Sequence, residues 1–274
     1  MDKTRFKLIS APSLSFGLGM TYMTLLVLLP IACLVLKAAQ VAPADYARVL
    51  SASDTLAAFR LSFGQAFLAA AFNTVMGVLL SWVLCRYDFP GRRLLDVMVD
   101  LPFALPTAVA GIALCGLYGP HGTIGHLLLP LGIEVAYTPL GIFIAMCFVG
   151  VPFVVRTVQP ALQNLDLSQE EAAACLGASR WYCIRRVVLP TLMPAILAGF
   201  SMSFARGVGE YGSVIFIAGN IPGKTEILPL QIVNALECYD YPAATVLAFT
   251  MLALSFVLLA TINLLQRGER HGRD

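Results

Sequence analysis

Charged side chains are scarce in this chain, and their scarcity excludes most soluble folds. Only 12% of the 274 residues are charged and 58% are hydrophobic, whereas soluble domains contain about 25% charged and about 45–50% apolar residues. A chain of this length has no core large enough to bury so much apolar surface, so we expect lipid to be its solvent. The net charge of +2 is also too small to indicate a nucleic-acid partner.

Residue types that build metal and catalytic sites are also sparse. The seven cysteines form no CxxC pair and fall mostly within apolar runs, as inert buried thiols do. His121 and His126 lack the spacing of a helical metal pair, and no carboxylate is placed to complete a site. We therefore predict no catalytic and no metal-binding residue, which leaves an intramembrane enzyme as a remote alternative.

Six segments are long enough to cross a membrane as helices, for which about 20 mostly apolar residues are needed. They are 16–37, 61–84, 94–118, 136–158, 192–217 and 242–265. The first is longer than the apolar region of a signal peptide, so we expect it to be retained. The sequence thus predicts an all-α polytopic membrane protein, with a transmembrane domain over 16–265 between a short segment 1–15 and a tail 266–274.

The distribution of lysine and arginine predicts the orientation of the chain. With the N-terminus inside, 13 of these residues lie on the cytoplasmic side and 4 lie outside. This excess of positive charge on one side places 1–15, the loop 159–190 and the tail 266–274 in the cytoplasm. The predicted location is the cell's inner membrane, crossed several times.

The cytoplasmic loop contains an unusual stretch, EEAAACLGASRWYCIRRVVLP, over 170–190. Ser168 followed by Glu171 fits a capping box, so a helix is expected to begin near Gln169. Gly177 can end this helix in a left-handed conformation. An ordinary solvated loop between two spans is the alternative interpretation.

A second short helix is expected after Ser179. It would carry Trp181, Ile184 and Val188 on one side, and its arginines would face water or a partner. Pro190 is expected to close the unit before the next span begins. Small residues flanked by charges, as in this loop, suit insertion into a groove of another protein.

Three parts of this stretch resemble a known motif. Glu171-Ala172-Ala173, Gly177 and Val187-x-Leu189-Pro190 are similar to the EAA motif of binding-protein-dependent ABC importer permeases, with Val187 in place of isoleucine as the one departure. The resemblance implies a type I (MetI-like) permease fold, in which this loop supplies a coupling helix to a cytosolic ATPase dimer.

The same resemblance implies the partners. ATP and Mg²⁺ would be bound by the ATPase, so this chain is expected to bind no cofactor of its own. A periplasmic binding protein would deliver the substrate, and a second permease subunit would complete the pathway. That subunit is expected to be a W-type paralogue, although nothing in the sequence separates a heterodimer from a homodimer. No nucleic acid is expected.

Further segments narrow the subgroup. Residues 100–111 and 151–160 resemble the sulfate and molybdate permeases, and 209–226 with 240–244 is most similar to the T-type subunit of sulfate/thiosulfate importers. Residues 221–223 and 228–230 instead resemble the molybdate relatives. The resemblance therefore implies sulfate or thiosulfate as substrate, with molybdate or tungstate as the alternative.

The candidates for the translocation path are few. Arg206 lies roughly 20 Å into the fifth predicted span at the helical rise, and a charge within the membrane is a functional candidate by default. Glu210, four residues later, either neutralises Arg206 or leaves it free to act beside the substrate. Ser201 and Ser203 are weaker polar candidates.

Two carboxylates and four prolines stand out in the predicted spans. Asp96 and Asp100 share a helical face in the third span, and we expect them to cap, pair or gate because carboxylates would repel a dianion. The prolines are expected to break or bend spans: 102, 106, 139 and 152. The stretch 218–225 matches a relaxed phosphate-loop pattern, but it follows a span instead of a strand, so an ATP-binding chain is excluded.

Overall fold

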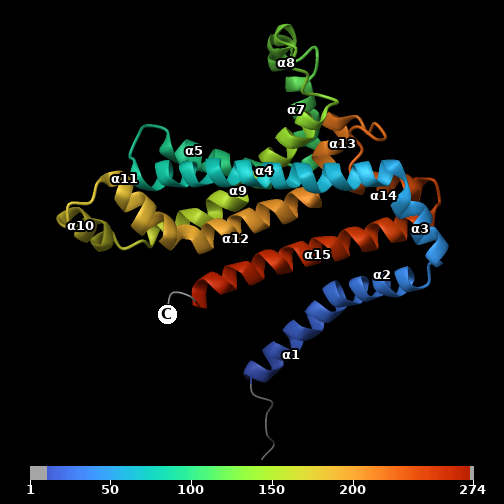
Figure 1. Ribbon diagram of the computed structural model, residues 1–274, viewed down its shortest axis with the longest axis horizontal. Coiled ribbons are helices and arrows are strands. Elements are labelled where there is room, and N and C mark those ends of the chain that lie inside the picture. The colour runs from blue at the N-terminus through green and yellow to red at the C-terminus, as the bar shows by residue number, and fades with distance from the viewer. Residues whose placement is uncertain (1–10, 272–274) are drawn as a thin grey trace, which may run out of the picture.

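The computed structural model describes residues 11–271, and these fold almost entirely as helices (Figure 1). Residues 1–10 and 272–274, with Lys3, Arg5, Lys7 and Arg273, lie outside the described part. The helices in chain order are α1 (Ala11–Met23), η1 (Thr24–Leu28), α2 (Leu29–Ala39), α3 (Pro43–Ser51), α4 (Ser53–Arg86), α5 (Arg92–Val99), α6 (Leu101–Ala104), α7 (Thr107–Tyr118), α8 (Thr123–Leu128), η2 (Leu129–Leu131), α9 (Pro139–Gln163), α10 (Leu167–Cys175), α11 (Arg180–Cys183), η3 (Ile184–Val188), α12 (Leu189–Val208), α13 (Gly212–Ala218), α14 (Leu228–Glu237) and α15 (Tyr241–His271).

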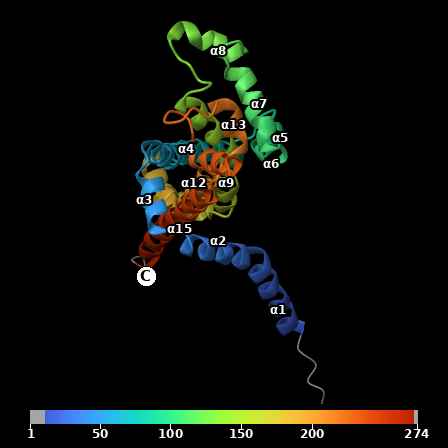
Figure 2. The same ribbon diagram turned by 90° about the vertical axis from the view of Figure 1, so that its right-hand side faces the viewer.

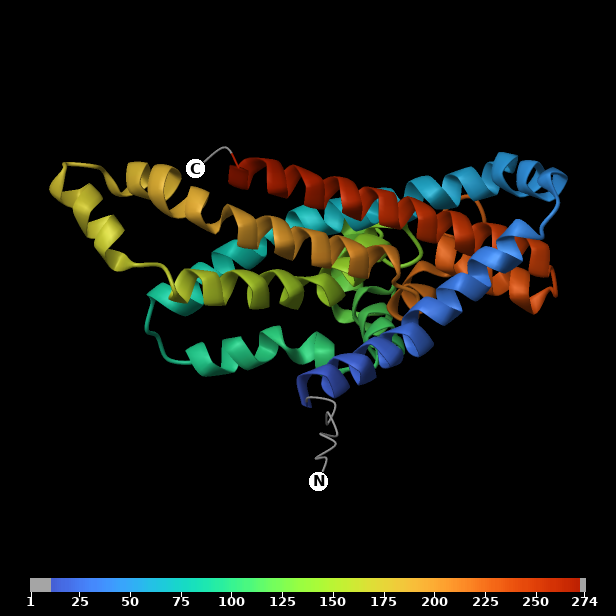
Figure 3. The same cartoon turned by 90° about the horizontal axis from the view of Figure 1, so that it is seen from below.

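Three long helices, α4, α9 and α12, lie side by side and form the centre of the molecule (Figures 1 and 3). Their contacts rely on small residues. A Cβ atom on Gly77 of α4 would lie 2.7 Å from Cγ1 of Val154, and one on Gly150 of α9 would lie 2.4 Å from Nδ2 of Asn73. Small residues of this kind let membrane helices approach closely, and dispersion contacts along the approach hold them together.

The remaining helices surround this centre unevenly. α15 contacts α14, α3 and α2, whereas α1 diverges from the bundle (Figure 2). α8 projects away from the bundle beyond α7 (Figure 1). The coupling-loop helix α10 lies at one end of the long axis, and α3 and α14 lie at the other (Figure 1).

Five helices of the described part are long and apolar enough to cross a membrane. They cover 15–39, 53–86, 139–163, 180–208 and 241–262, and each overlaps one of the six predicted spans. The predicted span 192–217 was wrong at both ends, because the helix begins at Arg180 and ends at Val208, and α13 follows as a separate helix.

The third predicted span, 94–118, is not one helix but three, α5, α6 and α7. Pro106 has no N–H to donate and holds Leu105 in an extended conformation (φ −84°, ψ 132°), which separates α6 from α7. The other prolines act differently: Pro102 lies in the first turn of α6, Pro139 starts α9, and Pro152 lies inside a continuous α9.

Pro190 does not close the loop, contrary to the sequence prediction. α11, η3 and α12 follow one another without a break as a 29-residue helix, Arg180–Val208. The five residues before Leu189 adopt a π-helical turn. Such a wider turn accommodates a proline that has no N–H and would clash with the carbonyl four residues earlier. The same arrangement, η1 followed by Pro30, occurs in the first span.

Candidate functional site

The coupling-loop helix α10 begins two residues earlier than the sequence predicted. Its N-cap is Asp166 and not Ser168, because the Asp166 carboxylate accepts a hydrogen bond from the backbone N–H of Ser168 at 2.9 Å. Aspartate caps a helix as well as serine does. Hydrogen bonds from Ser168 also lower the pKa of the Asp166 carboxyl, so the capping charge is present at neutral pH.

The other end of α10 has the geometry that the sequence predicted. Gly177 has φ +82°, in the left-handed region. Its N–H donates to the carbonyl of Ala174 at 2.9 Å, and the N–H of Ala178 donates to the carbonyl of Ala173 at 3.0 Å. This pair of bonds is a Schellman motif, in which glycine is favoured because it has no Cβ. The second short helix then begins after Ser179, whose Oγ accepts from the N–H of Tyr182.

Most of α10 is free to contact another protein. Glu171 and Ala172 are exposed, and Leu176 is 89% exposed. Trp181 on the second helix is 70% exposed, so the prediction that it shares a face with the buried Val188 was wrong. The π-helical turn between them shifts the register of the helix and so changes which residues share a side.

The second part of the motif is packed into the core, whereas the first part is exposed. Val187 and Leu189 pack against the buried cluster that joins α9 to α12, and Pro190 is half-buried. The buried members of this cluster are Val154, Val158, Leu162, Leu165, Cys183, Val188, Leu192 and Ile196. The coupling loop therefore consists of an exposed helix on a base that is part of the core.

One ion pair connects α10 to α4. Arg86, the last residue of α4, forms it with Glu170 through its Nη2 atom. The Arg86 guanidinium also lies over the ring of Trp82, 5.3 Å from its centroid. Both charged side chains are about one-quarter exposed, at 21% and 25%.

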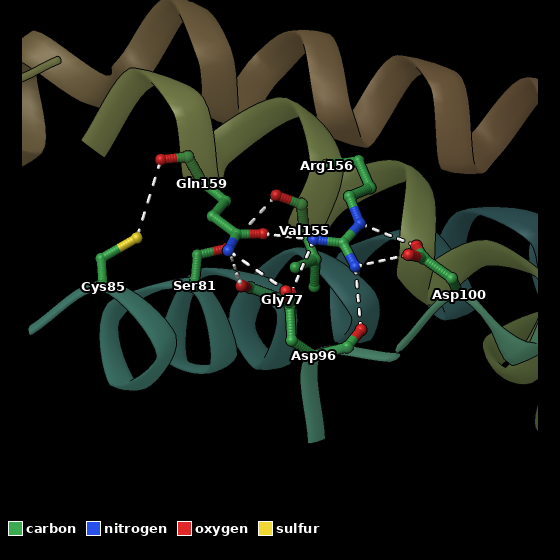
Figure 4. A network of polar contacts seen from close by, with 8 residues as sticks. All are labelled: Gly77, Ser81, Cys85, Asp96, Asp100, Val155, Arg156 and Gln159. Atoms are coloured by element: carbon green, nitrogen blue, oxygen red, sulfur yellow. Dashed lines mark hydrogen bonds and ion pairs between the residues drawn. The ribbon is translucent and has the colours of Figure 1, made fainter. Parts of the chain in front are cut away.

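A second polar network surrounds Arg156 on α9 (Figure 4). The Arg156 guanidinium donates to both carboxylate oxygens of Asp100, at 2.7 and 2.6 Å, and to Oδ1 and the backbone carbonyl of Asp96, at 2.7 and 2.8 Å. It also donates to Oε1 of Gln159 at 2.6 Å. These bonds match the five N–H donors of an arginine.

The network confirms that Asp96 and Asp100 both pair with Arg156. Pairing is one of the roles that the sequence allowed them. Asp100 sits between α5 and α6, so Arg156 holds this break in the third segment against α9. We define the Arg156 network as Arg156, Asp96, Asp100 and Gln159.

Arg206 and Glu210 form the internal pair that their spacing allowed. Arg206 Nη1 lies 2.5 Å from Glu210 Oε2, and Glu210 is 1% exposed. The other carboxylate oxygen of Glu210 accepts from the backbone N–H and the hydroxyl of Ser213, at 2.9 and 2.8 Å. Glu210 thus ties the end of α12 to the start of α13, and 31% of the Arg206 side chain remains exposed.

The two serines are not brought together with Arg206. Ser203 is 2% exposed and accepts a hydrogen bond from Nδ2 of Asn73 at 3.2 Å, inside the contact of α4 with α12. The hydroxyl of Ser201 donates to the carbonyl of Leu197 at 2.8 Å. Ser203 therefore serves helix packing, whereas Arg206 keeps an accessible face.

The sequence matches a known family model across most of its length. Residues 73–271 match the binding-protein-dependent transport system inner membrane component. The chain belongs to this family. It is therefore a membrane-spanning transport subunit and not an enzyme, and permeases of this kind work with an ATPase and a periplasmic binding protein.

Individual relatives of the permease are similar over nearly the whole chain. The sulfate transport system permease protein CysT of Escherichia coli strain K12 is 49% identical over 261 residues, which cover 95% of this chain and 94% of the relative. CysT of Synechocystis sp. strain PCC 6803 is 44% identical over 271 residues, covering 98% and 95%.

Solved structures share the fold of the permease. A chain of a bacterial ABC transporter that imports the acidic polysaccharide alginate has a TM-score of 0.77 at 15% identity, covering 93% of this chain and 95% of its own. A chain of the MetNI methionine transporter has a TM-score of 0.55 at 18% identity, covering 78% and 94%. The predicted MetI-like permease fold is thereby confirmed.

Sequence reasoning missed the roles of Arg86 and Arg156, which it used only to count charge. A signal for Arg156 was present, because Asp96 and Asp100 in an apolar segment need a cation at the same depth. Arg86 gave no comparable signal. Its partner lies 84 residues away in the sequence, beyond any helical spacing.

Proposed function

We propose that this chain is the permease subunit of an ATP-driven importer of sulfate. The observation that carries the proposal is the 49% sequence identity to the sulfate permease of Escherichia coli, which extends over nearly the full length of both chains. Thiosulfate, a tetrahedral dianion of similar size, is included in the proposal. Molybdate and tungstate are the competing substrates, and they are favoured only by the short segments 221–223 and 228–230.

The proposed partners follow from the exposed coupling loop and from the incomplete pathway of one chain. A cytosolic ATPase dimer binds ATP and Mg²⁺ and holds α10 in a cleft, with Glu171 to Gly177 at the contact. A second permease subunit, of the W type, forms the other half of the pathway. Both termini and the coupling loop are cytoplasmic, as the distribution of lysine and arginine predicts.

The proposed cycle has four steps. A loaded periplasmic binding protein docks on the outer loops, in 38–60, 119–135 and 218–241. ATP closes the two ATPase subunits, which draw the coupling helices together. The spans change from inward-facing to outward-facing and accept the oxyanion. Hydrolysis resets them, which requires that the nucleotide favour one of the two states.

Arg206 is the proposed cation beside the path, since it is neutralised on one side by Glu210 and accessible on the other. The binding protein holds the solute tightly in such a system, so the membrane contacts are expected to be weak. Ser201 and Ser203 contribute little to this path because their hydroxyls are used within the bundle.

Uptake measurements test the substrate. Cells that lack their own sulfate and molybdate permeases receive the complete transporter, and labelled sulfate uptake is measured with a tenfold excess of unlabelled thiosulfate or molybdate. We expect sulfate uptake that thiosulfate suppresses and molybdate does not. Uptake of labelled molybdate without uptake of sulfate would contradict the proposal.

A further inference from the structure

We propose that Arg86 is a positioning residue that couples α10 to α4, so that α4 acts as a lever between the ATPase side and the outer side. The inference rests on the proposed function, in which α10 receives the movement of the ATPase. It assigns a role to a residue outside the motif of the coupling loop.

The first step is the attachment of α10. The chain itself joins α10 to α9 at one end and to α11 at the other. No such covalent connection leads to α4. A cleft of about 370 Å³ separates α10 from the helix that begins at Arg180, and Trp82 is the one residue of α4 that lines it. The Arg86–Glu170 ion pair connects α10 directly to the end of α4.

The second step is the rigidity of Arg86. Its guanidinium lies against the ring of Trp82, one turn earlier on the same helix, and such a contact with an aromatic face is favourable for a cation. Trp82 in turn packs against the buried cluster between α9 and α12. The Arg86 charge is therefore held in one place, where Glu170 meets it.

The third step is the reach of α4. The helix has 34 residues, which corresponds to about 51 Å at 1.5 Å per residue. At its other end, the hydroxyl of Ser62 accepts from the backbone N–H of Leu228 at 2.8 Å, and Thr55 accepts from Gln231 at 3.3 Å. A tilt of α4 that begins at Arg86 is thus passed to α14, in the outer region where the binding protein is proposed to dock.

The two adjacent glutamates of the loop then have different roles. Glu171 is exposed and available to the ATPase, whereas Glu170 is directed toward the bundle by its ion pair. A movement imposed on Glu171 reaches α12 through the chain, because α11 and α12 are continuous. It reaches α4 through Glu170 and Arg86.

Charge reversal tests the inference in the complete transporter. Arg86→Glu, Glu170→Arg and the double variant are reconstituted in proteoliposomes with the ATPase, the second permease and the binding protein. Labelled substrate uptake and ATP hydrolysis are both measured. Each single variant is expected to lower uptake per ATP hydrolysed by about tenfold, within the range of typical coupling energies, and the double variant is expected to return within about twofold of wild type.

Two further variants separate coupling from folding. Arg93→Glu reverses an exposed charge near the same end of the bundle and should leave uptake per ATP unchanged. Arg86→Lys keeps the charge and should retain most of the coupling. A merely structural role would lower the thermal stability or the yield of the single variants and leave uptake per ATP of the folded protein at the wild-type value.

Wild-type uptake per ATP in Arg86→Glu, or failure of the double variant to recover, would overturn the inference. If sulfate is not the substrate, the result is different, because the wild-type transporter then hydrolyses ATP and takes up no sulfate. The same ratio is then measured with molybdate and its binding protein, and recovery in the double variant decides the inference there.

Discussion

Replacing Arg156 by lysine tests whether the Arg156 network holds the broken third segment in place. Lysine keeps the charge but has three donors and no planar fork, so it cannot reproduce the five hydrogen bonds of the arginine. At least two are lost. A hydrogen bond to a charged group contributes about 1.5–3 kcal/mol, but Asp96 and Asp100 are 40% and 47% exposed, so water replaces part of the loss. About 1 kcal/mol for each bond, or about 2 kcal/mol in all, is the expected cost.

This cost corresponds to a measurable change in melting temperature. For a chain of this size, 1 kcal/mol shifts Tm by about 2–4 °C, so Arg156→Lys is expected to melt about 4–8 °C below wild type. In a background where the exposed Cys33, Cys175 and Cys238 are replaced by serine, a maleimide dye that reacts with the buried Cys183 reports unfolding in detergent or nanodiscs. Arg93→Lys is the matched control, since Arg93 is exposed, and it should melt within about 1 °C of wild type.

An unchanged Tm in Arg156→Lys would refute the reasoning, because it would mean that one point charge supports α5 and α6 as well as the full set of bonds does. A second comparison is available in Asp100→Asn, which removes the bidentate acceptor. It should destabilise the protein more than Asp88→Asn, because Asp88 is almost fully exposed at 94%.

Three further predictions concern single positions. Gly111→Ala should lower Tm, because the added Cβ would lie 2.4 Å from the backbone oxygen of Ser213 and force α7 away from α13. Gly116→Ala on the same helix is the control and should leave Tm unchanged, because its Cβ would meet nothing within 4 Å. Gly177→Asp should insert normally but lose uptake and transporter-stimulated ATP hydrolysis, whereas Gly177→Asn, which tolerates the left-handed conformation, should keep more of both; wild-type uptake by Gly177→Asp would contradict the coupling assignment. Burial raises the pKa of Glu226 above its ordinary 4.5, so its contribution to stability is present below pH 4.5 and is lost as the pH rises through the raised pKa. As the pH falls toward 4.5, Tm should therefore rise less in Glu226→Gln than in wild type. Replacement of the exposed Glu237 by glutamine should leave this dependence of Tm on pH unchanged.

The sequence by itself determined the class of the protein and the position of its coupling loop. Apolar runs of membrane length, the one-sided distribution of arginine and the motif over 171–190 are local patterns, and each depends on residues close together in the chain. The Schellman end at Gly177 and the Arg206–Glu210 pair follow from the same local spacing, so they too could be predicted.

Only the tertiary structure decided which polar residues meet. Three contacts join residues that are 56 to 130 positions apart in the sequence and lie on different helices. They are Arg86 with Glu170, Arg156 with Asp96 and Asp100, and Ser203 with Asn73. Hydropathy indicates which segments cross the membrane, but it does not separate lipid-facing from core-facing positions or report which neighbour a residue finds there. The break of the third segment at Leu105 and the passage of a helix through Pro190 also depended on packing, because a proline either ends a helix or is accommodated by a wider turn.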